Sequence, residues 1–465
     1  MIVLKFGGSS IKDSHAIQSV ADIIHSKLNQ HPVVVLSACG DTTDNLLHAI
    51  DTARSGDLAH ALQEIDAIHN HHLGIVNELS LQPSWESNFT KISEAFLSEL
   101  QELLRGVSLL NDISAKSIDR IISFGERYST LLLNCLFNSQ DVRAHLADSC
   151  KFIKTTGKHT NAKPLLDESR PLIRSTFRDQ AGRYSIPIAQ GFIGSTIDGA
   201  TTTLGRGGSD YTASIIGAAL GVDAIEIWSD VDGILTADPT IISHAQAVRQ
   251  MTFREASELA YFGARVLHPD TILPAVEHDI PIYIYNTMNP DAAGSLIRRE
   301  FPDKAGKSIV KSIAYKEGIQ VLNLTSTRMF QAHDFLRKVF EVLDRHEVVA
   351  DLVSTSEVSI SIAFPRNVNH QPLVQELSKF STVNVESRKA IVCLVGEHMQ
   401  NHKGLAGKIF HQLQDVHINM ISQGASEVNL SFVIDEKDIE KVVRKLHATF
   451  FPIKQRVMKR VGIGR

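Results

Sequence analysis

The stretch Thr201-Thr-Thr-Leu-Gly-Arg-Gly-Gly-Ser-Asp210-Tyr-Thr decides the fold of this chain. Three glycines within four positions leave backbone N–H groups unobstructed, and Arg206, Ser209 and Asp210 lie among them. Amides together with a guanidinium can enclose a small anionic group. The apolar run at residues 213–220 predicts a helix, which would place the loop at a positive helix N-terminus. The stretch therefore indicates a site for phosphate or carboxylate.

A second glycine turn opens the chain, which begins Met1-Ile-Val-Leu-Lys5-Phe-Gly-Gly-Ser-Ser10. The apolar residues 2–4 predict a buried strand, and apolar residues recur at helical spacing from Ile17 to Leu28. Because the lysine precedes its glycines, the pattern differs from a P-loop. Lys5 at a strand end can hold phosphate oxygens, whereas the alternative is a surface lysine beside an ordinary turn. The two loops together favour a phosphate-handling enzyme.

Bulk composition excludes several classes of protein. The chain has 465 residues, 43% of them apolar, and a formal net charge of −5, so we expect several domains and no nucleic-acid partner. No apolar run reaches the ~20 residues that cross a bilayer, and no signal-peptide pattern is present. The four cysteines are scattered, and adjacent histidines at residues 69–72 would point in different directions on a helix. We therefore predict a soluble, cytoplasmic protein with reduced thiols and no metal site built from protein side chains.

Apolar runs and amphipathic helices alternate over the first 295 residues. Strands are predicted at 33–37, 143–146, 185–189, 224–229 and 281–285, and long helices at 57–79 and 91–104. Such alternation predicts a mostly parallel sheet in a three-layer α/β/α arrangement, with ligands at the carboxyl ends of its strands. We predict a catalytic domain at 1–295 and a polar linker at 296–312.

Two smaller units follow the linker, each with the element order β-α-β-β-α. The first is predicted to have strands at 318–325, 348–355 and 358–364 and helices at 333–346 and 371–380. The second is predicted to have strands at 389–396, 418–424 and 428–434 and helices at 404–414 and 437–450. This order predicts two α+β ferredoxin-like modules, at 313–386 and 387–465.

Further polar clusters lie near the predicted strand ends. They are Ser37-Ala-Cys-Gly-Asp-Thr-Thr-Asp44, Phe124-Gly-Glu-Arg-Tyr128, Gln190-Gly-Phe-Ile-Gly-Ser195, Trp228-Ser-Asp-Val-Asp-Gly-Ile-Leu-Thr-Ala-Asp-Pro239 and Phe262-Gly-Ala-Arg-Val-Leu-His-Pro269. Together with the two glycine loops they resemble the amino-acid kinase superfamily and, within it, the aspartokinases. The two trailing modules resemble the ACT domains of the monofunctional, lysine-sensitive type.

This resemblance implies transfer of the ATP γ-phosphoryl group to the β-carboxylate of L-aspartate, with Mg²⁺, as the first step of lysine, threonine and methionine biosynthesis. The catalytic residues it implies are Lys5, Arg206 and Asp210, with an N-cap of the following helix as the alternative role for Asp210. The residues implied to bind aspartate are Ala38, Thr43, Glu126, Phe192, Arg206 and Ser209. The residues implied to bind ATP are Lys5, Gly7, Gly8, Ser9, Ser229, Asp230, Leu235, Thr240 and Arg265.

Three nucleotide positions depart from the family pattern. A tyrosine and an arginine of that pattern are replaced by Leu235 and Thr240, and a lysine is replaced by Arg265. The last change keeps the charge but alters its geometry. We therefore expect Leu235 and Thr240 only to line the site.

The resemblance also implies an allosteric lysine pocket in the first ACT module and a homodimer or homotetramer formed through these modules. The pocket residues it implies are Met329, Leu336, Asp351, Thr355, Ser356 and Glu357, while Gln331 and Ala332 replace an expected histidine and serine. Two alternatives stay open: another amino-acid kinase, such as a glutamate 5-kinase, and a non-catalytic sensor of amino acids.

Overall fold

The computed structural model describes residues 1–178, 185–263, 269–301, 309–326, 332–367, 370–424 and 426–452. The chain forms two compact units. The first comprises Met1–Ile234, Arg249–Phe253 and Val266–Phe301, and the second comprises Leu235–Val248, Arg254–Arg265 and Pro302–Arg465. The predicted division into segments 1–295, 296–312, 313–386 and 387–465 stays a prediction. In the described part of the chain, every helix is too short or too polar to span a membrane.

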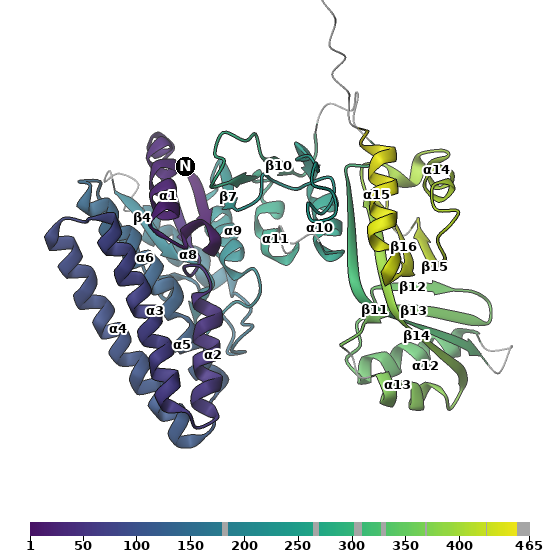
Figure 1. Ribbon diagram of the computed structural model, residues 1–465, viewed down its shortest axis with the longest axis horizontal. Coiled ribbons are helices and arrows are strands. Elements are labelled where there is room, and N and C mark those ends of the chain that lie inside the picture. The colour runs from purple at the N-terminus through teal and green to yellow at the C-terminus, as the bar shows by residue number, and fades with distance from the viewer. Residues whose placement is uncertain are drawn as a thin grey trace, which may run out of the picture. The chain divides into compact units, whose positions relative to one another are not determined.

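An eight-stranded sheet forms the centre of the first unit (Figure 1). Its strands, in spatial order, are β3 (Ala144–Ala147), β4 (Ile186–Gln190), β2 (Pro32–Leu36), β1 (Ile2–Phe6), β7 (Ala224–Ser229), β9 (Ile282–Asn286), β10 (Ser295–Arg298) and β8 (Gln250–Thr252). All neighbours are parallel except β9 and β10, which are antiparallel. The predicted, mostly parallel sheet is confirmed.

Helices pack against this sheet. They are α1 (Ser14–Ser26), α2 (Thr42–Arg54), α3 (Leu58–Leu79), α4 (Pro83–Leu110), α5 (Ala115–Ile122), α6 (Phe124–Ser139), α7 (Ser149–Phe152), α8 (Leu166–Arg178), α9 (Gly208–Leu220) and α11 (Pro269–Glu277). A short hairpin of β5 (Ile193–Ser195) and β6 (Thr201–Thr203) leads into the glycine-rich loop. The long helices α3 and α4 run side by side (Figure 1).

The alternation of side chains along β1 sets the direction of its lysine. Ile2, Leu4 and Phe6 belong to the apolar core that they share with α1 and α6. Because successive side chains of a strand point to opposite faces, Lys5 points to the other face of the sheet. The helix α9 packs against β1 and carries Asp210, which meets Lys5 there.

A six-stranded sheet forms the centre of the second unit. Its antiparallel strands, in spatial order, are β12 (Leu352–Thr355), β13 (Ser359–Pro365), β11 (Ser312–Ser326), β14 (Ser381–Val395), β16 (Asn429–Asp435) and β15 (Ile418–Gln423). Its helices are α10 (Phe253–Tyr261), α12 (Ala332–Arg345), α13 (His370–Leu377), α14 (Leu405–His411) and α15 (Ile439–Phe450). The predicted order of strands and helices in the two modules is confirmed.

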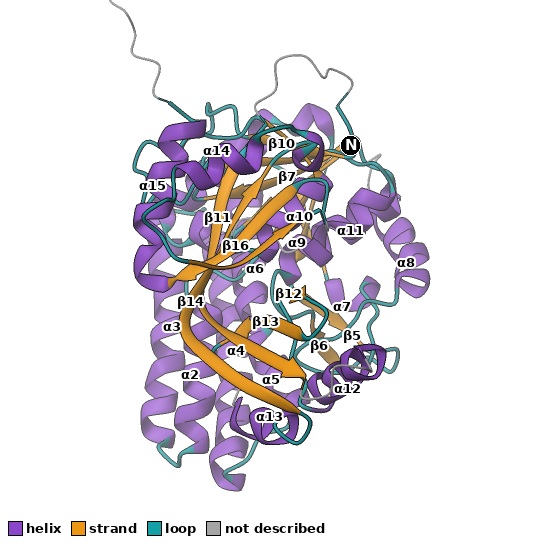
Figure 2. Cartoon of the chain, turned by 90° about the vertical axis from the view of Figure 1, so that its right-hand side faces the viewer, coloured by secondary structure: helices purple, strands orange, loops and turns teal. Residues whose placement is uncertain are grey.

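The two central strands are longer than the sequence predicted. Figure 2 shows β11 and β14 as long, curved neighbours, and each contains 15 residues. The first half of β11 packs in one apolar core through Ile313, whereas the second half packs in another through Leu322 and Leu324. Both cores therefore share one continuous sheet, and the second core begins before the first module in the sequence.

Candidate active site

The two glycine loops meet through an ion pair. The Nζ of Lys5, at the carboxyl end of β1, lies 2.7 Å from Oδ1 of Asp210 in the first turn of α9. Both side chains are nearly buried, with 11% and 12% exposure. The cap residue of α9 is Gly207, whose φ of 72° is left-handed. The alternative interpretation of Asp210 as an N-cap is therefore wrong, since Asp210 binds the lysine.

Arg206 lies in the same loop, four positions before Asp210 in the sequence, and it is exposed. Within the described residues it has no ion-pair partner. Its guanidinium can therefore bind an incoming carboxylate in a bidentate manner without first breaking an internal ion pair.

The backbone of the first glycine turn is partly engaged by the protein itself. The amide of Gly7 donates to the carbonyl of Trp228 at 3.1 Å, which extends the pairing of β1 with β7. The predicted donation by Gly7 to phosphate is therefore wrong in this structure, because the amide is already used. The carbonyl of Gly8 accepts from the amide of Gly40 at 3.0 Å and so ties this turn to the loop after β2. The amide of Gly8 and the half-buried Ser9 remain the candidates at this turn.

Glu126 is a buried carboxylate at the start of α6, with 2% exposure. Its Oε1 accepts from the amide of Ala38 at 3.1 Å, and its Oε2 has no hydrogen-bond partner among the described residues. Burial raises the pKa of Glu126 to about 8. A buried, incompletely paired carboxyl group is a suitable partner for the ammonium of an amino acid.

Close packing brings the loop after β2 against α6. A Cβ atom placed on Gly125 would lie 2.7 Å from Cβ of Ala38 and 3.6 Å from Oγ1 of Thr43. Only glycine permits this approach, so the residue before Glu126 lets Ala38 and Thr43 lie beside the carboxylate. The sequence-predicted residues Ala38, Thr43 and Glu126 are thus brought together.

The glycine after β4 performs the same function for the second loop. A Cβ atom on Gly191 would lie 2.5 Å from Cβ of Ser209. The next residue, Phe192, adopts a left-handed φ of 66°, which is uncommon for an aromatic residue, and its carbonyl accepts from the amide of Leu204 at 2.9 Å. Ser209 and Phe192 therefore lie against each other's loops, as predicted for a shared site.

The predicted nucleotide residues fall into three groups. Ser229 ends β7, the strand beside β1, and the exposed Asp230 follows it. Leu235 and Thr240 belong to the second compact unit, where the Leu235 carbonyl accepts from Ser312 and Thr240 donates to Asp238. Arg265 lies outside the described residues.

Sequence reasoning missed one polar residue at this edge of the sheet. Asn286 ends β9 and donates from Nδ2 to Oδ1 of Asp232 at 2.7 Å. Asn289 donates to the same oxygen at 3.4 Å. The signal was the asparagine directly after the apolar strand predicted at 281–285.

The predicted effector residues lie in the second unit. Asp351 has a side chain with 2% exposure, and its Oδ1 accepts from Nζ of Lys316 at 2.6 Å and from the Tyr261 hydroxyl at 3.1 Å. Its buried Oδ2 has no partner among the described residues. Asp351 is therefore half engaged by an internal cation, which the sequence did not predict.

The remaining predicted effector residues are less closely grouped. Leu336 packs on the apolar core under α12, and Met329 lies outside the described residues. Thr355, Ser356 and Glu357 are exposed around the end of β12. The Ser356 and Ser359 hydroxyls lie 2.7 Å apart.

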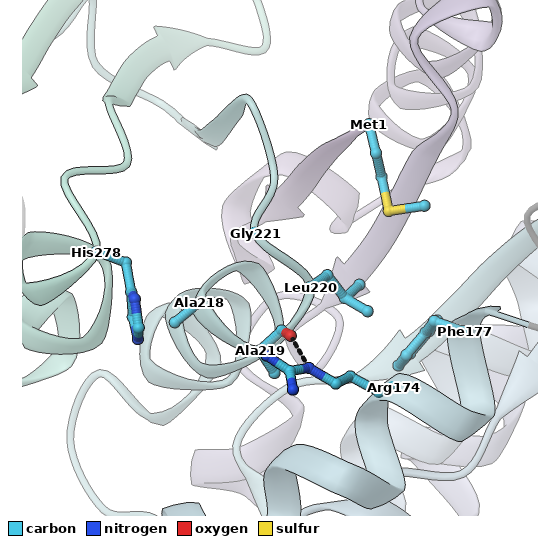
Figure 3. A pocket seen from close by; sticks show the side chains of 8 residues that line it. All are labelled: Met1, Arg174, Phe177, Ala218, Ala219, Leu220, Gly221 and His278. Atoms are coloured by element: carbon cyan, nitrogen blue, oxygen red, sulfur yellow. Dashed lines mark hydrogen bonds between the residues drawn. The ribbon is translucent and has the colours of Figure 1, made fainter.

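A pocket elsewhere in the first unit is not the candidate site. It is lined by Met1, Arg174, Phe177, Ala218, Ala219, Leu220, Gly221 and His278 (Figure 3). Met1 precedes β1 and Gly221 follows α9, so this pocket lies at the amino ends of the strands. Its guanidinium is engaged, since Nε of Arg174 donates to the Ala219 carbonyl at 2.8 Å. Ligands of open parallel sheets bind at the opposite edge.

The described residues contain no cluster of three or more His, Cys, Asp or Glu side chains that could hold a metal ion. A magnesium ion that enters with a nucleotide needs only one or two carboxylates, because phosphate oxygens and water complete its shell. Asp210 and Asp230 at the strand ends fit that requirement.

Comparison with known proteins agrees with this geometry. Residues 1–286 match the model of the amino acid kinase family, and residues 392–450 match that of the ACT domain. Aspartokinase 1, chloroplastic, of Arabidopsis thaliana is 40% identical, covering 97% of this chain and 80% of the relative. Lysine-sensitive aspartokinase 3 of Escherichia coli is 34% identical, covering 97% and 99%.

Two solved structures of E. coli aspartokinase III are also similar. The complex with aspartate and ADP, described as the R-state, has a TM-score of 0.85 at 35% identity and covers 97% of this chain and 100% of that one. The complex with lysine and aspartate, described as the T-state, has a TM-score of 0.78 at 34% identity and covers 97% and 99%.

Proposed function

Because the chain belongs to the amino acid kinase family and, within it, to the aspartokinases, we propose that it transfers the γ-phosphoryl group of ATP to the β-carboxylate of L-aspartate. The products are 4-phospho-L-aspartate and ADP. The observation that carries the proposal is the contact of Lys5 with Asp210 at 2.7 Å, which joins both glycine loops at the carboxyl end of the sheet.

The chemistry needs charge neutralisation more than proton transfer. A β-carboxylate is ionised at neutral pH, so its oxygen attacks the γ-phosphorus without a general base while the bond to the bridging oxygen of ADP breaks. The obstacle is that two anions must approach and that charge develops on the transferred group. The ammonium of Lys5 meets this need at the phosphoryl oxygens, and Asp210 holds that ammonium in position.

We assign the binding of aspartate to the groups around α6 and the glycine-rich loop. The carboxylate of Glu126 pairs with the substrate ammonium, which completes the partners of its buried Oε2. The exposed guanidinium of Arg206 clamps a substrate carboxylate. Ala38, Thr43, Phe192 and Ser209 line the space between them.

We assign the nucleotide to the strand ends of β1 and β7. The amide of Gly8, Ser9, Ser229 and Asp230 lie along the phosphates and the ribose, with Arg265 as a further cation and Leu235 and Thr240 as lining positions. Mg²⁺, held mainly by the phosphates with Asp210 or Asp230 nearby, supplies further neutralisation of phosphate charge.

We also propose feedback inhibition by lysine through the pocket around Asp351. Two relatives carry lysine in their names or titles, and the unpartnered Oδ2 of Asp351 offers a site for an ammonium. Lysine then favours a state in which the catalytic loops are displaced. A homodimer or homotetramer through the ACT modules, a cytoplasmic location and a role in the lysine branch from aspartate complete the proposal.

A hydroxylamine-trapping assay tests the catalytic proposal. Purified full-length protein with MgATP should form an acyl hydroxamate with L-aspartate and none without an amino acid. Faster reaction with L-glutamate would favour a glutamate kinase instead. No hydroxamate with any amino acid would favour a non-catalytic sensor.

A further inference from the structure

Asp119 of α5 is a fully buried carboxylate that the catalytic proposal does not use, with 0% exposure. Its Oδ1 accepts from Oγ1 of Thr203 at 2.6 Å, and its Oδ2 lies 2.7 Å from Nδ1 of His159. The amide of Thr160 donates to both oxygens, at 3.0 and 3.1 Å. Both oxygens therefore have donors, from two separate segments of the chain.

These segments lead directly to the substrate groups. Thr203 ends β6, three positions before Arg206, and Asp119 lies seven positions before Glu126, with α6 following α5 at once. The contact of Asp119 with Thr203 thus connects the helix pair that carries the ammonium partner to the loop that carries the guanidinium.

The loop at residues 159–162 reinforces the connection. The amide of Ala162 donates to the Thr203 carbonyl at 2.9 Å. A Cβ atom on Gly205, which has a left-handed φ of 74°, would lie 2.6 Å from Oδ1 of Asn161. The glycine-rich loop is therefore packed on a segment that Asp119 also holds.

We propose that Asp119 is a positioning residue, which fixes the Arg206 loop relative to Glu126 and thereby sets the affinity for aspartate. This inference rests on the proposed function. A buried carboxylate without its donors is costly, so each donor is held firmly against it. The hydroxyl of Thr203 is the donor closest to Arg206 in sequence, so its loss should release the loop without touching the substrate.

The test compares Thr203→Val, which keeps the shape of the side chain but removes the hydroxyl, with Thr203→Ser, which keeps the hydroxyl. A hydrogen bond to a charged group is strong enough that Thr203→Val should raise KM for aspartate by about tenfold. KM for ATP should change by less than about twofold, since the ATP groups lie on β1 and β7. Thr203→Ser should restore the aspartate KM to near the wild-type value.

Two further variants complete the experiment. Thr90→Val removes a hydroxyl that bonds only to its own helix, at the Glu86 carbonyl, and should change neither KM. Asp119→Asn should repeat the effect of Thr203→Val and replaces it if that variant does not fold. An unchanged aspartate KM in a folded variant, or equal rises of both KM values, would overturn the positioning role. Absence of aspartate turnover in the wild-type protein would instead overturn the proposed function.

Discussion

Lys5 at the carboxyl end of β1 forms an ion pair with Asp210 at the start of α9, with 2.7 Å between Nζ and Oδ1. More than two hundred residues separate the two in sequence, yet the pair is nearly buried. The contact holds an ammonium at a strand end without neutralising Arg206 in the adjoining loop. One cation is thus fixed for the phosphoryl group while the other remains open for the acid.

Replacement of Lys5 tests the role of the fixed ammonium. Lys5→Ala should lower kcat by at least about 10²-fold, because the loss of one preorganised group that stabilises transition-state charge has effects of this order. Steady-state kinetics at saturating aspartate and ATP measure the change, and circular dichroism confirms that the variant is folded. Lys5→Arg serves as the control that keeps the charge and should retain more activity than Lys5→Ala. Near-normal turnover of a folded Lys5→Ala variant would contradict the role.

The raised pKa of Glu126 predicts a pH dependence of stability. Burial raises this pKa to about 8, so between its ordinary value and pH 8 the folded protein retains a proton that the unfolded chain has lost. The free energy of unfolding should therefore fall as pH rises through this window, by at most about 1.4 kcal/mol per pH unit from this group. Glu126→Gln cannot titrate, so its stability relative to wild type should increase with pH. A constant difference in urea unfolding from pH 5 to 8 would contradict the raised pKa.

The same group predicts a pH dependence of substrate binding. Because the substrate ammonium favours the ionised form of Glu126, KM for aspartate should fall as pH rises from 6 to 8. The Glu126→Gln variant should bind aspartate weakly and should lack this trend. A matching pH trend in the variant would assign the titration to another group.

The close approach of Gly191 to Ser209 predicts the effect of one added methyl group. In Gly191→Ala the new Cβ would lie 2.5 Å from the Ser209 side chain, so the glycine-rich loop must shift, and KM for aspartate should rise by about tenfold or more. Gly74→Ala is the matched control, because Gly74 lies within α3 with no atom within 4 Å of the new Cβ. It should leave kinetics unchanged and raise stability by up to about 1 kcal/mol. Equal kinetics for the two variants would contradict the assigned contact.

The ion pair of Lys316 with Asp351 predicts how strongly lysine inhibits. The internal ammonium of Lys316 competes with an effector ammonium for the same carboxylate, at 2.6 Å. Since a partly exposed ion pair contributes up to about 1 kcal/mol, Lys316→Met should lower the half-inhibiting lysine concentration by about fivefold. Lys441→Met, which removes an exposed partner of Asp415, is the control. Weaker inhibition of Lys316→Met would show that Lys316 supports the pocket instead of competing for it.

Local patterns predicted much of the fold. The apolar runs of β2, β7 and β9 and the helical spacing of α3 were visible because each depends on neighbours in the sequence. The full length of β11 and β14 was not, because their halves serve different cores and only the pairing of Ser312 with Val395 and of Ser326 with Ser381 reveals one sheet. Such pairing depends on contacts between residues far apart in the sequence.

The same distinction applies to the candidate site. Lys5, Arg206 and Glu126 were found because their motifs carry charge beside glycine. The engagement of the Gly7 amide by Trp228 and of Asp351 by Lys316 was missed, since each partner comes from a different strand. Asp119 gave no motif signal, because a single buried carboxylate in a helix resembles any other until its donors are known.

The most direct measurement of the central claim is a crystal structure of the protein with L-aspartate and a non-hydrolysable ATP analogue. We predict that the Lys5 ammonium lies within about 3 Å of a phosphate oxygen while the Arg206 guanidinium binds a carboxylate of the same aspartate. Lys5 and Arg206 directed to different surfaces, with neither in contact with the bound pair, would contradict it.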